Sequence, residues 1–320
     1  MNTNFDSLSA DFQKLELDDG LFALRFSASN WSYLLVSSQG TCLIDAGVPA
    51  QKLRAALAAQ PELTDVLALD WRAEAELRAA FPSARCHAWP APEAEKSAVR
   101  GAVQGLQAVY RRAQRADAGL SLEHDAVSGE EGSALSLEGE GSLPRLLSLC
   151  QDWRQSAPLP QGMTLLGQRV QLIPCLGMLP GSCLLWCSER GALFCGEMLS
   201  EANALAWVAD FEAQLALFER CRQLPLQHLL GRSGASQGQR RLGLAQRLLS
   251  GLLPHLLSAL GEAKTALQLA QPDFAALSPE HELSEHAIAY QLLLEQLVVH
   301  GELSREGEAA AARFQRALAG

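Results

Sequence analysis

The chain has 320 residues and a formal net charge of −10, and 48% of its residues are hydrophobic. That content is enough for a buried core and excludes a mostly disordered protein, while the length allows one large domain with an appendage or two domains. Because neutralising phosphates requires clustered Lys and Arg, the negative charge argues against a general nucleic-acid binder.

The first ninety residues predict strands that alternate with helices. The runs LFALRFSAS, WSYLLVSS and TCLIDAG are rich in β-prone residues and are separated by Gly, Ser or Asn, which predicts an antiparallel start to a sheet. Helical spacing in AQKLRAALAAQ and RAEAELRAAF then alternates with the strand-like runs LTDVLALD and ARCHAW. This alternation indicates a layered α/β fold.

The middle of the chain contains a second β-rich half. Residues 91–115 have a helical pattern, whereas residues 116–142 are acidic, rich in Gly and Ser and poorly periodic, which predicts a flexible insert. A helix in LPRLLSLCQDW leads into the strand-like runs MTLLGQRVQLIPCLG, SCLLWCS and ALFCGEML. An amphipathic helix follows, and LQHLLGRSGAS predicts a last strand that runs into a loop.

Beyond residue 237 the pattern is almost purely helical, with a long helix interrupted at Pro254, a short helix and another long helix. This order is typical of a small winged-helix-like module. From residue 240 onwards seven Arg and Lys stand against nine Asp and Glu, so the basic stripe of a nucleic-acid reader is missing. We expect the module to pack on the main domain or on a second subunit, which makes a homodimer possible.

The cellular location is predicted from what the sequence lacks. Its first residues have neither a basic nor an apolar region, so they do not form a secretory signal, and no stretch reaches the ~18 apolar residues of a membrane span. Most of the eight cysteines lie in apolar runs without C-x-x-C spacing, as expected of buried free thiols. We therefore expect a cytoplasmic protein that binds neither membranes nor nucleic acids.

Four motifs in order resemble the metallo-β-lactamase superfamily. NWSYLLVSSQGTCLIDAGVP is similar to that family's first sheet, and PCLGMLPGSCLLW and ALFCGEML are similar to strands that typically read PGHTPGS and LFTGD. TALQLAQPDF with YQLLLEQLVVHGEL is similar to the winged-helix extension of one branch. The resemblance implies an α/β (α+β) protein with a four-layer αββα sandwich over residues 1–236 and an all-helical winged-helix-like domain over residues 237–320.

In that family, zinc is held by a T-H-x-H-x-D-H loop and by a later His, Asp and His, and the metal activates a water molecule. The resemblance places no histidine at these seven positions, and shifting the register of the loop by one or two residues brings none in. The loop positions carry Asp70, Arg72, Glu74 and Ala75, and the later positions carry Met178, Glu197 and Arg232.

The resemblance therefore implies a vestigial pocket without catalytic residues, zinc or another cofactor. One hypothesis is that Arg72 and Arg232 neutralise Asp45 and the other carboxylates there, because Arg supplies fork-shaped donors for buried carboxylates. Alternatively, the carboxylates bind a hard cation such as Mg²⁺ or Ca²⁺, or they are unrelated surface charges.

The predicted function is that of a catalytically degenerate protein of this fold, a binding or regulatory pseudoenzyme whose partner is a small molecule or a protein. The alternative is a metal-dependent hydrolase of esters or thioesters, similar to glyoxalase II, with a divergent metal site.

Overall fold

We describe the fold from a computed structural model. The residues described are 12–27, 30–46, 48–58, 62–91, 93–117, 135–156, 158–199, 208–232, 234–260, 264–266, 268–269, 283–299, 303–306 and 313–316.

The first half of the chain forms a six-stranded sheet whose strands pair in sequence order. Each of the first four strands pairs antiparallel with the next of the four, and the last two strands run parallel to the fourth. The predicted strands are confirmed, and an additional edge strand precedes them. The strands are β1 (Gln13–Asp18), β2 (Leu21–Arg25), β3 (Trp31–Ser37), β4 (Gly40–Ile44), β5 (Asp65–Leu67) and β6 (Arg85–His87).

The second half forms another six-stranded sheet, again in sequence order. Only its fourth and fifth strands pair in parallel, and its last strand, which the sequence analysis treats as a loop, returns antiparallel. The strands are β7 (Gln161–Leu165), β8 (Gln168–Pro174), β9 (Cys183–Cys187), β10 (Ala192–Gly196), β11 (His228–Gly231) and β12 (Gly234–Gln237).

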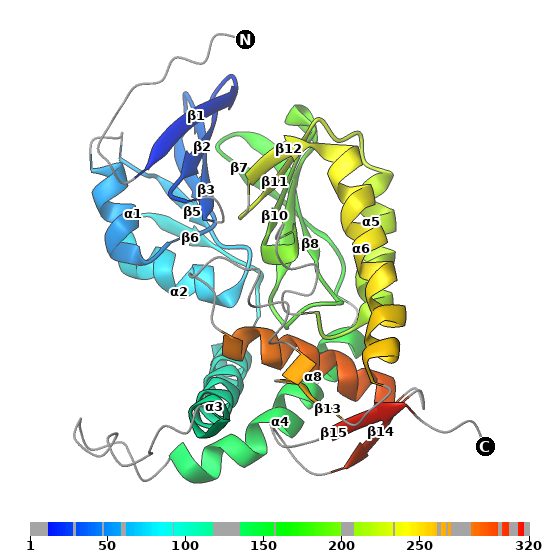
Figure 1. The fold of residues 1–320 in the computed structure, drawn as a ribbon. Helices are drawn as coiled ribbons and strands as arrows, with labels where there is room; N and C mark the ends of the chain where they lie inside the picture. Colours follow the sequence, from blue (N-terminus) through cyan, green and yellow to red (C-terminus); the bar gives the residue numbers. More distant parts are fainter. Residues whose placement is uncertain are drawn as a thin grey trace.

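The two sheets lie face to face, with helices on both outer sides, as Figure 1 shows. This arrangement confirms the predicted four-layer αββα sandwich. One helical layer lies against the first sheet and the other against the second sheet. The first layer contains α1 (Ala50–Leu57) and α2 (Trp71–Ala80), and the second contains α5 (Phe211–Arg222) and α6 (Gly238–Ala259).

Alternation along the strands assigns side chains to different layers of the core. In β10, Phe194 packs between the sheets, whereas Leu193 and Cys195 on either side of it face the outer helices. In the first sheet, Leu67 faces the second sheet and Val66 faces α1 and α2. Both sheets are thus covered on both faces, which explains their nearly continuous runs of apolar residues.

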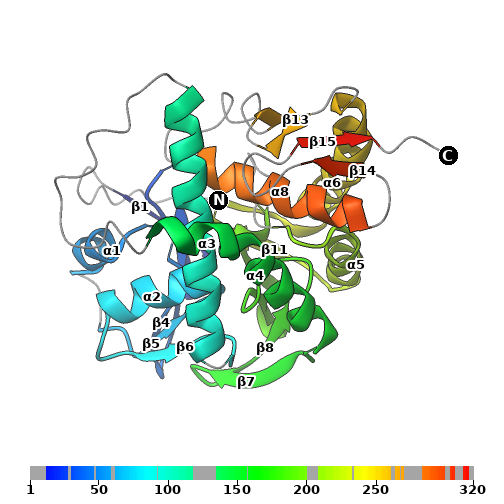
Figure 2. The same ribbon diagram turned by 90° about the horizontal axis from the view of Figure 1, so that it is seen from below.

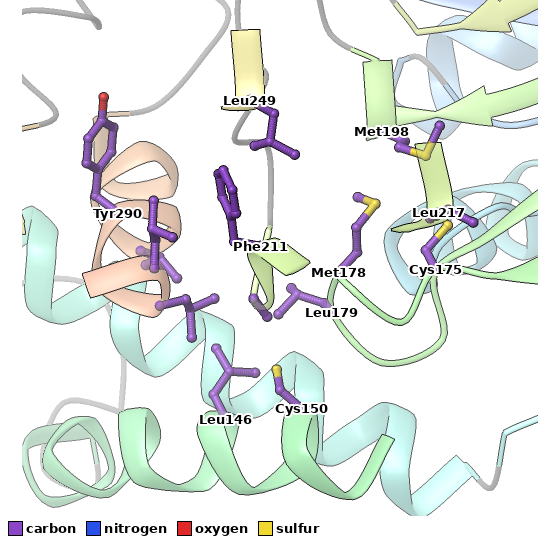
Figure 3. Close-up of a cluster of buried hydrophobic side chains, with 14 of the residues drawn as sticks. Leu146, Cys150, Cys175, Met178, Leu179, Met198, Phe211, Leu217, Leu249 and Tyr290 are labelled. Carbon is purple, nitrogen blue, oxygen red and sulfur yellow. The ribbon is translucent and has the colours of Figure 1, made fainter. Parts of the chain in front are cut away.

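A third group of elements lies below the sandwich and crosses its end (Figures 1 and 2). Figure 3 shows Leu146 and Cys150 pointing from this group towards Leu179 of the sandwich, near Phe211 of α5. These side chains belong to one buried cluster, so the group and the second sheet share a core. The elements are α3 (Glu93–Asp117), α4 (Leu135–Gln155), β13 (Lys264–Thr265), α8 (Leu283–Val299), β14 (Leu303–Glu306) and β15 (Arg313–Arg316).

The region beyond residue 237 is not all-helical as predicted, because β13, β15 and β14 form a three-stranded sheet. Its strands are too short to show a clear alternation of apolar and polar residues. Leu303 and Phe314 are buried apolar residues of this sheet. Pro254 does not interrupt α6, which continues through it. The likeness to a winged helix and the domain boundary at 236/237 stay predictions.

The predicted insert at 116–142 begins and ends in helices. The structure places residues 116–117 in α3 and 135–142 in α4, and the rest of the insert lies outside the described residues. The sequence analysis missed the start of α4 because Gly139, Gly141 and Pro144 lower its helical propensity, although the helix continues through all three. Among the helices that the structure describes, none is both long and apolar enough to cross a bilayer.

We predict that Tyr110→Phe lowers the free energy of unfolding by about 1–3 kcal/mol, because a buried acceptor loses its donor. The Tyr110 hydroxyl on α3 donates to Gln291 Oε1 on α8 at 2.8 Å, and both residues are fully buried. Urea denaturation measures the loss. The exposed Leu159 supplies the control, since Leu159→Ala should change stability by less than about 0.5 kcal/mol. Equal stabilities of the two variants would contradict the prediction.

Candidate functional site

The candidate site lies where four strands end. Asp45 follows β4 and Asp70 lies just beyond β5, while Glu197 follows β10 and Arg232 follows β11. Each of these two strand pairs is parallel, so their carboxyl ends lie at the same edge of their sheet. Such edges are the usual place for binding sites in open α/β sheets.

Backbone hydrogen bonds join the two sheets at this edge. The Trp31 amide at the start of β3 donates to the Arg232 carbonyl at 2.9 Å, and the Cys183 amide at the start of β9 donates to the Leu69 carbonyl at 2.9 Å. The strand ends are therefore held in fixed positions relative to one another, and so are the side chains that follow them.

Two of the turns are sterically demanding. Asp45 has a φ of 62°, and its carboxylate accepts a hydrogen bond from the Ala46 amide at 3.0 Å. Gly196 has a φ of 52°, and a Cβ atom there would lie 3.3 Å from Asp45 Oδ2 and 3.2 Å from Leu69 Cβ. A larger residue at 196 would be strained in this conformation and would crowd Asp45.

Asp70 both begins a helix and takes part in the site. Its Oδ1 atom caps α2 by accepting from the amides of Arg72 and Ala73, each at 2.8 Å. Its other oxygen accepts from Arg232 Nη2 at 3.0 Å. The cap fixes the orientation of the carboxylate and places Arg72 in the first turn of α2, directly beside it.

Arg232 contacts all three carboxylates of the site. Its Nε and Nη2 donate to the two oxygens of Asp45 at 3.2 and 3.1 Å, which is the paired geometry favoured between a guanidinium and a carboxylate. Nη2 also donates to Asp70, and Nη1 donates to Glu197. Glu197 accepts a further hydrogen bond from Arg72 Nη2, so it bridges the two guanidinium groups. We call these five residues the arginine cluster: Asp45, Asp70, Arg72, Glu197 and Arg232.

Burial and charge act in opposite directions on the pKa values of the cluster. Burial raises the pKa of the Asp45 carboxyl above its usual value, and the charge of Arg232 offsets only part of this rise. Although burial would also raise the pKa of Asp70, the charges of Arg232 and Arg72 and two backbone amides hold it below its usual value. Despite its burial, Arg232 has a raised pKa because carboxylates surround it, so it stays cationic.

A small pocket borders the cluster. Its free space is about 10 Å³, which is about enough for one water molecule. Asp70, Arg72, Ser182 and Glu197 form its polar part, and apolar or sulfur-containing side chains form most of the rest. The lining residues are Leu69, Asp70, Trp71, Arg72, Cys175, Met178, Leu179, Ser182, Cys183, Cys195, Gly196, Glu197 and Met198.

Some of the predicted site residues lie elsewhere. Glu74 faces away from the cluster, where its carboxylate accepts from Lys96 Nζ at 2.7 Å and from Arg78 Nη2 at 2.9 Å. Ala75 is exposed on α2. Met178 is buried and lines the pocket, but it does not belong to the arginine cluster. Successive helix positions differ in direction by about 100°, which explains why only the first residues of α2 reach the site.

Sequence reasoning missed the thiols beside the site. Cys175, Cys183 and Cys195 line the pocket as free cysteines, together with Met178 and Met198. Burial raises the pKa of all three thiols, so they stay protonated. Their positions in apolar runs predict burial, but nothing in the spacing of these cysteines indicates that they gather around one pocket.

The residues at this site do not fit zinc. Zinc sites use neutral imidazoles, thiolates and carboxylates, whereas the centre of this site is a guanidinium group, which cannot ligate a metal. Within the described part of the chain, no group of three or more His, Cys, Asp or Glu side chains is arranged to hold a metal ion. The carboxylates that converge here are already directed at Arg232.

Solved structures confirm the fold. A metallo-beta-lactamase family protein from Thermus thermophilus matches with a TM-score of 0.60 and 17% identity, over 94% of this chain and 100% of the other. A beta-lactamase domain protein from Burkholderia ambifaria matches with a TM-score of 0.56 and 14% identity, over 98% and 96%. No protein-family model and no curated protein sequence matches the chain. The chain therefore has the metallo-β-lactamase fold, as the sequence motifs predict.

We predict that Arg232→Ala lowers the free energy of unfolding by about 3–5 kcal/mol, because three carboxylates lose their shared cation in a buried place. Urea denaturation measures the change. Arg78→Ala is the matched control, since the Arg78 side chain is 58% exposed and should contribute about 0–1 kcal/mol to its pair with Glu74. Similar losses in both variants would show that the cluster is not a buried ion network.

Glu74 should make stability depend on pH. Although burial would raise its pKa, hydrogen bonds from Lys96 and Arg78 hold it below the usual 4.5. Its stabilising contribution is therefore complete above about pH 4.5 and is lost as the pH falls through the lowered value. Glu74→Gln should cost about 1–3 kcal/mol at neutral pH. The urea midpoints of both proteins should converge as the pH falls below 4.5, and a difference that stays constant with pH would contradict this assignment.

Proposed function

We propose that this chain is a non-catalytic metallo-β-lactamase-fold protein, a pseudoenzyme that acts by binding. The observation that carries the proposal is the position of Arg232, whose guanidinium donates to Asp45, Asp70 and Glu197 at once. A permanent cation thus lies at the point on which these carboxylates converge. A second cation at this point would be repelled by Arg232 and would find its carboxylate partners already engaged.

The sequence positions of these residues support the proposal further. Four members of the cluster stand at positions that the family resemblance assigns to metal ligands: Asp70, Arg72, Glu197 and Arg232. The guanidinium and the carboxylates satisfy one another there, so the site is stable without an added ion. A catalytic metal site, in contrast, keeps an open coordination position for water or substrate.

The proposed mode of action is the binding of a small molecule or a protein in the cytoplasm, with a homodimer as a further possibility. The acidic net charge of −10 supports a partner other than nucleic acid. The competing function is hydrolysis of esters or thioesters by a divergent metal site. It requires the same carboxylates to bind a metal ion instead of Arg232, so one experiment separates the two functions.

That experiment measures metal content and hydrolysis together. Protein purified without chelator should contain zinc well below one equivalent, and adding Zn²⁺, Mg²⁺ or Ca²⁺ should leave its melting temperature unchanged. The rates of ester and thioester hydrolysis should equal those of the Arg232→Ala variant. Stoichiometric zinc, together with hydrolysis that a chelator abolishes, would overturn the proposal in favour of the hydrolase. A melting temperature raised by Mg²⁺ or Ca²⁺ alone would instead show a hard-cation site.

A further inference from the structure

Glu197 differs from the other carboxylates around Arg232. Its side chain is 18% exposed, compared with 11% for Asp70 and 2% for Asp45. It accepts hydrogen bonds from Arg72 through one oxygen and from Arg232 through the other. Glu197 borders the pocket, as Asp70 and Arg72 do, and it is the more exposed of these two carboxylates. The Glu197 carboxylate therefore lies between two guanidinium groups and at the border of the pocket.

Arg232 does not depend on Glu197 for its position. Three further hydrogen bonds, two to Asp45 and one to Asp70, hold its Nε and Nη2 atoms at 3.0–3.2 Å. If the Glu197 side chain moved away, Nη1 would remain directed at the vacated position. Arg72 would remain beside it, since the Asp70 cap fixes the start of α2. The two guanidinium groups thus form a preorganised binding site for a carboxylate, to which both donate hydrogen bonds.

The charges favour exchange of one carboxylate for another. With Glu197 in place, the cluster contains three carboxylates and two guanidinium groups, so one negative charge is in excess. Removing the Glu197 carboxylate balances the charges, and a single incoming carboxylate restores the original state. A doubly charged anion such as hydrogen phosphate would add a further negative charge beside Asp45 and Asp70, which is unfavourable in a partly buried site.

The pocket indicates what the rest of the ligand would be. Next to Arg72 and Glu197 its walls are formed by Met178, Leu179 and Met198, which offer an apolar surface. Because its free space of about 10 Å³ holds only about one water molecule, a ligand has to displace the Glu197 side chain. Flexible Met side chains adapt to different shapes at such surfaces, so modest repacking accommodates a short chain.

We propose that Arg72 and Arg232 form a binding site for a small monocarboxylate with a short apolar chain, and that Glu197 occupies this site as an internal ligand until the carboxylate displaces it. The inference rests on the proposed binding function and names its ligand class. Glu197 lowers the affinity of the site because the ligand has to break two charge-assisted hydrogen bonds before it can form its own.

Calorimetric titration with sodium butyrate, at constant ionic strength in chloride, tests this site. Wild-type protein should bind butyrate weakly, and Glu197→Ala should bind it at least about ten-fold more tightly, because no internal carboxylate competes. Adding Arg72→Gln to Glu197→Ala should remove that gain. Glu219→Ala is the matched control, since this exposed Glu pairs with Arg222 outside the cluster, and its affinity should equal that of the wild type.

Several outcomes would overturn the inference. Equal affinities of wild type and Glu197→Ala would show that Glu197 does not compete, and absence of butyrate binding by Glu197→Ala would show that the site does not exist. Inorganic phosphate binding as tightly as butyrate would exclude the monocarboxylate assignment. If Glu197→Ala does not fold, Glu197→Gln keeps the size of the side chain and should show a smaller gain, because its neutral amide oxygen accepts weaker hydrogen bonds than the carboxylate and is displaced more easily. Chelator-sensitive hydrolysis would overturn the proposed function, whereas loss of the butyrate gain overturns this inference alone.

Discussion

The hydrogen bonds from Arg232 to Asp45, Asp70 and Glu197 join residues that follow strands of both sheets. A buried cation with its carboxylates fixes geometry, because every member loses a partner if one strand end shifts. The left-handed backbone at Asp45 and the glycine at 196 are consequences of this constraint, since both bring the chain close to the shared centre. The cluster therefore holds the backbone at the four strand ends together.

The two halves of the sandwich supply equivalent parts of the cluster. Each sheet contributes the residues that follow a parallel pair, β4 with β5 in the first and β10 with β11 in the second. In the first half the side chains that reach the cluster are two carboxylates and Arg72, and in the second half they are Glu197 and Arg232. The first half therefore carries one negative charge in excess and the second half is neutral. The ion pairs that join the halves are those of Arg232 with Asp45 and Asp70 and of Arg72 with Glu197, which makes the cluster an electrostatic contribution to the packing of the sheets.

The fold was largely predictable because its strands are short apolar runs separated by turn residues, and their order carries the resemblance. The family resemblance placed Asp45, Asp70, Arg72, Glu197 and Arg232 in one pocket, and pairing of the two arginines with the carboxylates was one of the hypotheses that followed. Glu74 and Lys96 could not be paired in advance, because their contact depends on how α3 packs against α2. The C-terminal strands were missed for a different reason: with one buried residue each, β14 and β15 contain no periodicity to detect.

The order in which the cluster residues emerge from the ribosome affects how this protein folds. Asp45 and Asp70 are synthesised long before Arg232, which is 187 residues away from Asp45 along the chain. Until residue 232 has been added, these carboxylates lack the guanidinium group that lies between them. The contact between Tyr110 and Gln291 joins residues that are 181 positions apart. Contacts between such distant residues slow folding, because a large loop has to close before they form. We therefore expect this edge of the first sheet to stay hydrated during synthesis, and the sandwich to close late in folding.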